Sequence, residues 1–337
     1  MSIGLWAVFT VVAAFGQTLR NAMQKELTAT LGTVGATHVR FLFGLPFALV
    51  FLVCVLAATG YSFPAINSRM MAWTILGAGA QIAATAMLLA ALKQKSFVVT
   101  TALIKIEPVH VALFGLIFLG DALSVPLIVA ILIACAGVLI MSWPKDQASA
   151  VADGGWQPAL LGLAAGAVFG ISAIGYRGGI LALEHPNFVV AATTTLAIGL
   201  IMQTAVLTAY LFIFERDRLM AIFRAWRPSV FAGFMGAFAS QMWFLAFALE
   251  SAAKVRTLAL VEIFFAQHVQ AGPRLARRAR HCPRGHRRHH SAQRLTGVRT
   301  RSGSALPHFL PVLPQLVPQT LDNLALVVSV NRGVTLH

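Results

Sequence analysis

Residues 106–144 read IEPVHVALFGLIFLGDALSVPLIVAILIACAGVLIMSWP, and this stretch determines the fold that we expect. It contains two apolar runs, which the residues Leu119, Gly120 and Asp121 separate, and Pro108 stands near the start of the first run. An apolar run of about 20 residues is long enough to cross a membrane as a helix. The stretch therefore predicts two membrane helices joined by a tight turn, the first of them kinked at Pro108.

The remainder of the chain has the same apolar character. Of the 337 residues, 58% are hydrophobic and only 11% are charged, whereas a soluble domain carries roughly a quarter charged residues. We therefore expect an all-α polytopic membrane protein in which residues 215–228 form a connection. The nine expected spans are approximately 3–24, 33–57, 70–92, 97–119, 124–143, 157–180, 188–213, 229–249 and 254–267.

The spans repeat along the sequence. Residues 98–106 match residues 255–263 at five of nine positions, and a shorter match joins 13–16 to 167–170. A repeat of about five spans has an odd number of crossings, so the second copy is upside down relative to the first. Inverted repeats of this kind are typical of secondary transporters, which place their substrate site at the repeat interface.

Residues 106–144 resemble the end of an EamA domain of the drug/metabolite transporter superfamily. The similarity rests on the proline inside a helix, the Leu-Gly-acid turn at 119–121 and the Gly-hydrophobic pair at 137–138. The segment VFGISAIGYRGGI, residues 168–180, is similar to the opening of a second EamA copy. The resemblance implies ten helices in two inverted halves and the transport of a small metabolite.

The repeats and the resemblance together predict the domain organisation. Residues 1–144 form the first EamA-like repeat, 145–156 a linker, and 157–267 a second repeat that stops inside its fourth helix. The sequence lacks the second Leu-Gly-acid turn and the tenth helix, so about nine spans are expected. Residues 268–337 form a separate tail that we expect to be disordered.

Ionisable side chains inside a membrane are costly, and each is a candidate functional residue by default. The main cluster lies in the fourth expected span and comprises Lys105, Glu107, Pro108 and His110. Glu262 occupies the repeat position equivalent to Lys105 and is its expected partner. Such a pair could seal the cavity in one state and bind substrate charge in another. The alternative is a structural kink, with Lys105 extending toward the membrane surface.

Further polar residues could line a route through the helices: Gln17, Asn21, Gln81 and Gln241. Hydrogen bonds between neighbouring membrane helices are an equally good interpretation of these residues. His38 and Arg40, near the start of the second span, are expected to be anchors at the membrane surface.

The function that we expect is secondary transport of a small metabolite by alternating access, with an amino acid or a similar polar solute among the candidates. We expect no enzyme activity, catalytic residue, metal or cofactor, and no nucleic acid partner. Membrane lipid is the expected surrounding, in the plasma (inner) membrane. Proton coupling through Glu107, a homodimer and the sidedness of the termini are left open. The alternatives are an inactive truncated product and an intramembrane enzyme.

The tail has a composition unlike the rest of the chain. Residues 271–337 contain 11 arginines, no lysine and one acidic residue, and so carry +10 of the formal net charge of +15. A zinc site built from Cys282, His286, His289 and His290 would lack the paired spacing of zinc motifs. Arginine without lysine is what a GC-rich gene yields when it is read in a shifted frame. We therefore hypothesise a frameshift near codon 268.

This hypothesis predicts that another reading frame of the same gene, downstream of codon 268, encodes a Leu-Gly-acid turn followed by an apolar helix. Resequencing the gene and translating all frames checks the prediction. The hypothesis is wrong if neither alternative frame encodes these two features.

Overall fold

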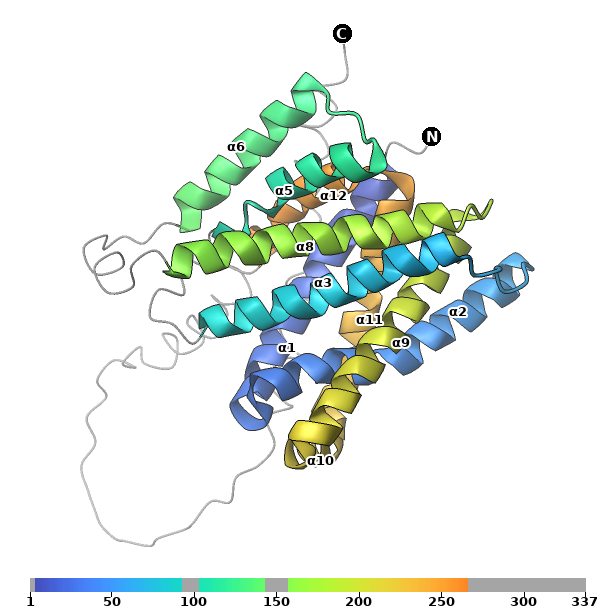
Figure 1. Ribbon diagram of the computed structural model, residues 1–337, viewed down its shortest axis with the longest axis vertical. Helices are drawn as coiled ribbons and strands as arrows, with labels where there is room; N and C mark the ends of the chain where they lie inside the picture. Colours follow the sequence, from blue (N-terminus) through green and yellow to red (C-terminus); the bar gives the residue numbers. More distant parts are fainter. Residues whose placement is uncertain (1–3, 93–102, 143–156, 266–337) are drawn as a thin grey trace, which may run out of the picture. The chain divides into compact units, whose positions relative to one another are not determined.

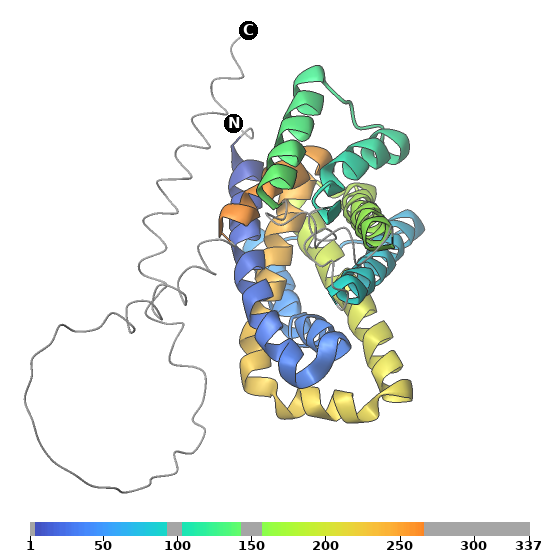
Figure 2. The same cartoon turned by 90° about the vertical axis from the view of Figure 1, so that its left-hand side faces the viewer.

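The computed structural model describes residues 4–92, 103–142 and 157–265 (Figures 1 and 2). Within these residues every regular element is a helix, so the all-α prediction is confirmed. The linker 145–156, the start of the fourth expected span and the tail lie outside the described residues. The helices are α1 (Leu5–Leu42), α2 (Leu45–Thr59), α3 (Ser68–Leu92), α5 (Glu107–Phe114), a π-helical turn (Gly115–Leu119), α6 (Val125–Ser142), α8 (Gln157–Ala182), α9 (Phe188–Phe214), α10 (Arg216–Arg224), α11 (Trp226–Leu249), α12 (Ala252–Leu258) and a 3-10 turn (Ala259–Val261).

Several of these helices are long and apolar enough to cross a membrane. Two shorter apolar helices, Glu107–Leu119 and Val125–Ile140, coincide with the fourth and fifth expected spans. The described part of the chain therefore has the helices of a membrane-embedded protein. The five long segments are Val34–Thr59, Ser68–Leu88, Ala159–Ala182, Phe188–Phe214 and Trp226–Leu249.

Helix α1 contains a sharp change of direction at Gly32. Its φ of 70° and ψ of 178° are not helical, and a positive φ of this kind strongly favours glycine. The chain folds back there. A hydrogen bond of 3.0 Å across the reversal, from the Gln24 amide nitrogen to the Ala36 carbonyl, joins the two parts of the helix. The two parts of α1 thus correspond to the first expected span and to the start of the second, which continues through α2 (Figure 2).

The helix that carries Pro108 is broken, where the sequence predicted only a kink. Residues 103–104 are helical, Lys105 and Ile106 form a turn, and α5 begins at Glu107 with the proline in its first turn. Proline is well tolerated at that position, where its missing N–H leaves no hydrogen bond unmade. After the π-helical turn, Gly120 adopts a φ of 69° and starts the connection to α6.

The main helix contacts join the first half of the described chain to the second. Helix α1 packs along α11, and α3 packs along α8 (Figure 1). Helix α2 contacts α9, and α5 contacts α12. The largest buried cluster includes residues from both halves, such as Met70, Val111, Ile174 and Phe247.

The connections between helices also meet across the two halves. Asn67, before α3, donates to the Ala182 carbonyl at 2.7 Å, and the Tyr61 ring lies 4.9 Å from the His185 ring. The end of α2 therefore lies beside the start of α9. At the reversal of α1, a second buried cluster joins residues of α1 such as Leu31 to Ile222 of α10.

The connection expected at residues 215–228 contains the short helix α10, which the sequence analysis did not predict. The nine residues Arg216–Arg224 form a helix with Leu219 and Ile222 buried and Met220 and Phe223 exposed. The segment is too short to cross a membrane and too rich in charge to register as a span. Its two buried side chains pack onto the reversal of α1 and hold it as a helix.

Glycines allow α3 and α8 to approach closely, as the abundance of small residues in membrane helix interfaces would favour. A Cβ atom on Gly77 would lie 2.9 Å from the backbone nitrogen of Tyr176. A Cβ atom on Gly79, two residues along the same helix, would meet nothing within 4 Å. The pair offers a matched test of this contact.

We expect Gly77→Leu to destabilise the detergent-purified protein by about 1–3 kcal/mol, because overpacking forces the two helices apart. Gly79→Leu is the control and should leave the unfolding temperature close to that of the wild type. Thermal unfolding followed by tryptophan fluorescence measures both variants. Equal unfolding temperatures for the two variants would show that α3 and α8 do not make this contact.

Candidate functional site

Lys105 and Glu262 form an ion pair in the interior of the described helices. The Lys105 ammonium group contacts the Glu262 carboxylate, as the repeat alignment predicted. Lys105 lies in the turn that precedes α5, and Glu262 follows the 3-10 turn Ala259–Val261. Both charged groups therefore stand where a helix is interrupted.

The Glu262 carboxylate has a second partner on α1. The Gln17 amide nitrogen donates to its other oxygen at 2.7 Å. The Gln17 amide oxygen in turn accepts from the Trp243 indole nitrogen of α11 at 3.2 Å. Gln17 therefore joins the ion pair to the α1–α11 contact, and its amide orientation is fixed by its two partners.

Glu107, the first residue of α5 and two residues after Lys105, forms a second ion pair with Arg256 of α12. Their carboxylate oxygen and guanidinium nitrogen are 3.2 Å apart, in a geometry that is not a hydrogen bond. The Arg256 guanidinium also lies over the rings of Trp243 and Phe247, at 4.9 and 5.5 Å from the ring centroids. Such stacking stabilises a desolvated arginine.

These contacts link six side chains in one continuous series, whose two ends lie two residues apart in the sequence and which we call the charge ring. It consists of Lys105, Glu262, Gln17, Trp243, Arg256 and Glu107. Both ion pairs cross between the segment around the start of α5 and the segment of α12 and the 3-10 turn. Breaking both pairs would be required for these two segments to separate.

A third ion pair lies at the Leu-Gly-acid turn. Asp121 contacts Arg177 of α8 at 3.2 Å, and the Asp121 backbone nitrogen donates to the Gly115 carbonyl at 3.0 Å. Arg177 also donates to the carbonyls of Phe247, at 2.6 Å, and Glu250. The turn that carries the family resemblance thus fastens the α5–α6 connection to α8 and to the end of α11.

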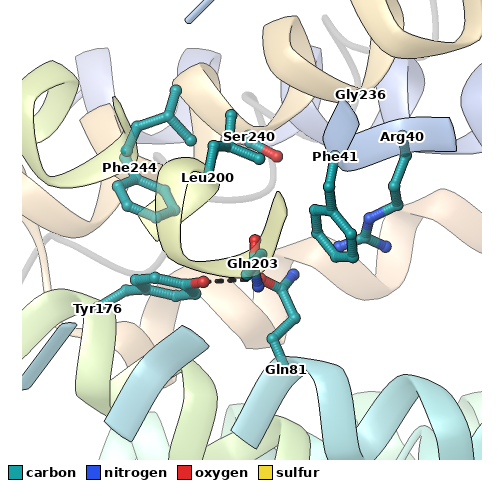
Figure 3. Close-up of a pocket in the computed structure, with 10 residues that line it drawn as sticks. Arg40, Phe41, Gln81, Tyr176, Leu200, Gln203, Gly236, Ser240 and Phe244 are labelled. Atoms are coloured by element: carbon teal, nitrogen blue, oxygen red, sulfur yellow. Dashed lines mark hydrogen bonds between the residues drawn. The ribbon is translucent and has the colours of Figure 1, made fainter. Parts of the chain in front are cut away.

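A cavity separate from the charge ring lies between α1, α3, α8, α9 and α11 (Figure 3). Its empty volume is about 300 Å³, and its walls leave room for about one water molecule. The Gln81 amide oxygen accepts from the Tyr176 hydroxyl at 3.0 Å and from the Gln203 amide at 2.8 Å. The cavity is lined by Arg40, Phe41, Gln81, Tyr176, Leu196, Leu200, Gln203, Gly236, Ser240 and Phe244.

The other predicted site residues take different positions. Asn21 is exposed and accepts from Arg20 at 2.8 Å. His110 lies on α5 beside Phe114, three residues after Glu107. Gln241 donates to Thr193 of α9 at 2.8 Å and does not line the cavity, so it serves as a contact between helices. Pro108 is buried.

Of the two residues expected at the membrane surface, His38 lies inside the protein and Arg40 is half-buried. His38 is fully buried, and its Nε2 lies 3.0 Å from the Thr208 hydroxyl of α9. Arg40 lines the cavity. The sequence analysis also missed Tyr176, Gln203 and Ser240, because a single polar residue in an apolar run does not reveal which way it faces.

Metal ligands do not gather in the part of the chain that the structure describes: no group there has three or more His, Cys, Asp or Glu side chains close enough to hold an ion. Cys54 is exposed and Cys135 is buried, and both are free. The histidine and cysteine residues of the tail lie outside the described residues.

No protein-family model matches the chain, and no curated protein matches it. Its fold does resemble solved structures. One of them, described only as "Crystal structure of protein", aligns with a TM-score of 0.58 at 13% sequence identity, covering 83% of this chain and 89% of that chain. At this identity the likeness shows a shared fold, and the function has to be argued from the residues of the site.

The ion pair of the charge ring generates a prediction about stability. Replacing Lys105 with methionine leaves the Glu262 carboxylate without its cation, which we expect to cost about 1–3 kcal/mol. Adding Glu262→Gln to that variant removes the unpaired charge and should recover most of the loss. Thermal unfolding of the single and double variants in detergent measures this coupling. Strictly additive losses would show that the two residues do not interact.

Proposed function

We propose that the protein is a secondary transporter that moves a small metabolite across a membrane by alternating access. The observation that carries this proposal is the charge ring, in which two ion pairs cross between the two halves at interrupted helices. Helices interrupted within the membrane are typical of transporter substrate and ion sites. Charged groups inside a membrane are energetically costly and therefore rare, and those that occur usually mark a functional site.

The helix contacts support an inverted repeat. In an inverted repeat, α1, α2, α3 and α5 of the first copy correspond in order to α8, α9, α11 and α12 of the second. Exchanging the two copies then converts the α1–α11 contact into the α8–α3 contact. These are the two main contacts of the described helices. The same exchange leaves the α2–α9 and α5–α12 contacts unchanged, and both of these contacts are present.

The connections support the opposite orientation of the two halves. In an inverted repeat, the connection after the second helix of one copy lies on the same side as the connection before the second helix of the other. Tyr61 and Asn67 meet His185 and Ala182 in this way. The reversal of α1 at Gly32 is the connection before the second helix of the first copy, and α10 lies in the connection after the second helix of the second copy. These two connections also contact each other.

The ion pair of Lys105 and Glu262 adds a geometric argument. The two residues occupy equivalent repeat positions, and equivalent positions related by a two-fold axis touch only when they lie beside that axis. The pair would therefore mark the pseudo-two-fold axis, which is where transporters with inverted repeats place their substrates. We infer that rupture of both ion pairs accompanies the change between the two access states.

We further propose that the chain is related to the EamA transporters that its sequence resembles, a relationship that implies ten helices in two inverted halves. We place it in the plasma (inner) membrane as a multi-pass protein surrounded by lipid. Its chemistry requires neither catalysis nor a bound cofactor. Glu107, which pairs with Arg256, is the residue that we propose for any coupling of a proton to transport.

We test the proposal with purified protein in liposomes and a panel of radiolabelled metabolites. The wild type should accumulate at least one solute. Lys105→Met and Glu107→Gln should each reduce this uptake by about tenfold or more, because they break the charge ring. The matched control is Lys254→Met, since Lys254 pairs with Glu250 at an exposed position of α12 outside the ring.

Uptake that survives both substitutions would remove these residues from the mechanism. A wild type that is folded yet moves no member of the panel would contradict the transport proposal and favour an inactive product.

A further inference from the structure

We propose, on the basis of the transport function above, that the transported solute is a small organic anion, bound by the guanidinium groups of Arg20 and Arg40. The anionic group would be a carboxylate or a phosphate ester, both of which arginine binds through paired hydrogen bonds. In the described state the cavity of Figure 3 has room for about one water molecule, so it would hold the organic part only after the helices around it move apart during the access cycle.

The distribution of buried charge is the first argument. Among the side chains that the structure describes, Glu262, Glu107 and Asp121 each have a basic partner already, whereas Arg20 and Arg40 have no carboxylate within ion-pair distance. Within this described part, two positive charges are thus left without compensation. The pairs already formed are Lys105–Glu262, Arg256–Glu107 and Arg177–Asp121.

The surroundings of these arginines are the second argument, since Arg20 is buried and Arg40 is half-buried. Arg20 is only 7% exposed, and its hydrogen-bond partner is the neutral amide of Asn21, at 2.8 and 3.3 Å. Arg40 lies at the cavity wall, with its guanidinium 4.4 Å from the centroid of the Phe41 ring. An uncompensated buried cation is costly, and an anionic ligand supplies the missing charge.

The fold brings the two arginines close together although they belong to the two parts of α1 on either side of Gly32. Because α1 reverses there, both side chains pass beside Gly236 of α11. A Cβ atom on that glycine would lie 3.5 Å from the Arg20 Cδ and 3.6 Å from the Arg40 Cβ. Gly236 and Arg40 line the cavity, and Arg20 lies next to this part of its wall.

The other walls of the cavity suit the body of an organic anion. Phe244, Leu196 and Leu200 supply apolar surface. In the part of the chain that the structure describes, the Gln81 amide nitrogen and the Ser240 hydroxyl donate to no protein group and are available to a ligand. In contrast, the charges of the ring are already neutralised in pairs, so the excess positive charge lies at the cavity.

The experiment uses four compounds with the same small hydrocarbon body: propionate, propyl phosphate, propionamide and propylammonium. Stabilisation of the full-length protein against heat in detergent measures binding, and uptake into liposomes measures transport. We expect propionate or propyl phosphate to raise the unfolding temperature and to be taken up. Propionamide and propylammonium should do neither, and the stronger of the two anions identifies the anionic group.

Substitution of the arginines tests their role. Arg20→Gln and Arg40→Gln should each weaken the apparent affinity for the anion by about tenfold or more, as expected for loss of a charged hydrogen-bond donor. Arg40→Lys keeps the charge and should retain part of the affinity. Arg216→Gln, on the exposed surface of α10, is the control and should bind as the wild type does.

The inference is overturned if the amide or the ammonium compound stabilises the wild type as well as the anions do, a comparison that needs no variant. Anion binding that is unchanged in both glutamine variants also overturns it. Uptake of uncharged solutes alone would keep the transport function and reject the anion. Arginine-dependent binding of anions without any uptake would keep the anion site and reject transport.

Discussion

The contact between the Lys105 ammonium group and the Glu262 carboxylate places strict demands on the helices around it. Each charge is tolerable inside a membrane only while the other is beside it, so the start of α5 and the end of the 3-10 turn must meet. The breaks in both segments free backbone groups and allow the two side chains to approach. Gln17 and Trp243 then tie the pair to the α1–α11 contact.

The positions of the charged side chains near the cavity depend on another interrupted helix, α1. Because α1 reverses at Gly32, its two parts present Arg20 and Arg40 to the same position on α11. The charge ring is electrically balanced, whereas the cavity wall has an excess of positive charge. In the transport function that we propose, the ring would hold the two halves together and the cavity would select the solute.

The helical class, most of the spans and the partner of Lys105 could be predicted from the sequence. Apolar runs and the repeat offset extend over many residues, and they can be recognised in the sequence without knowing how the side chains pack. The reversal at Gly32, the helix α10, the burial of His38 and the position of Arg40 at the cavity could not be predicted. Each depends on which neighbour a side chain meets, and a uniformly apolar span has no periodicity to indicate that face. Gln81 was found because it is polar, but its partner Gln203 was not.

The most direct test of the account is to locate two connections that the inverted repeat makes equivalent. Single cysteines at Ser62, between α2 and α3, and at Asp217, between α9 and α11, would be labelled with a membrane-impermeant thiol reagent in a background without native cysteines. Both positions are exposed. The account predicts that the two cysteines react from opposite sides of the membrane. Labelling of both from the same side would contradict it.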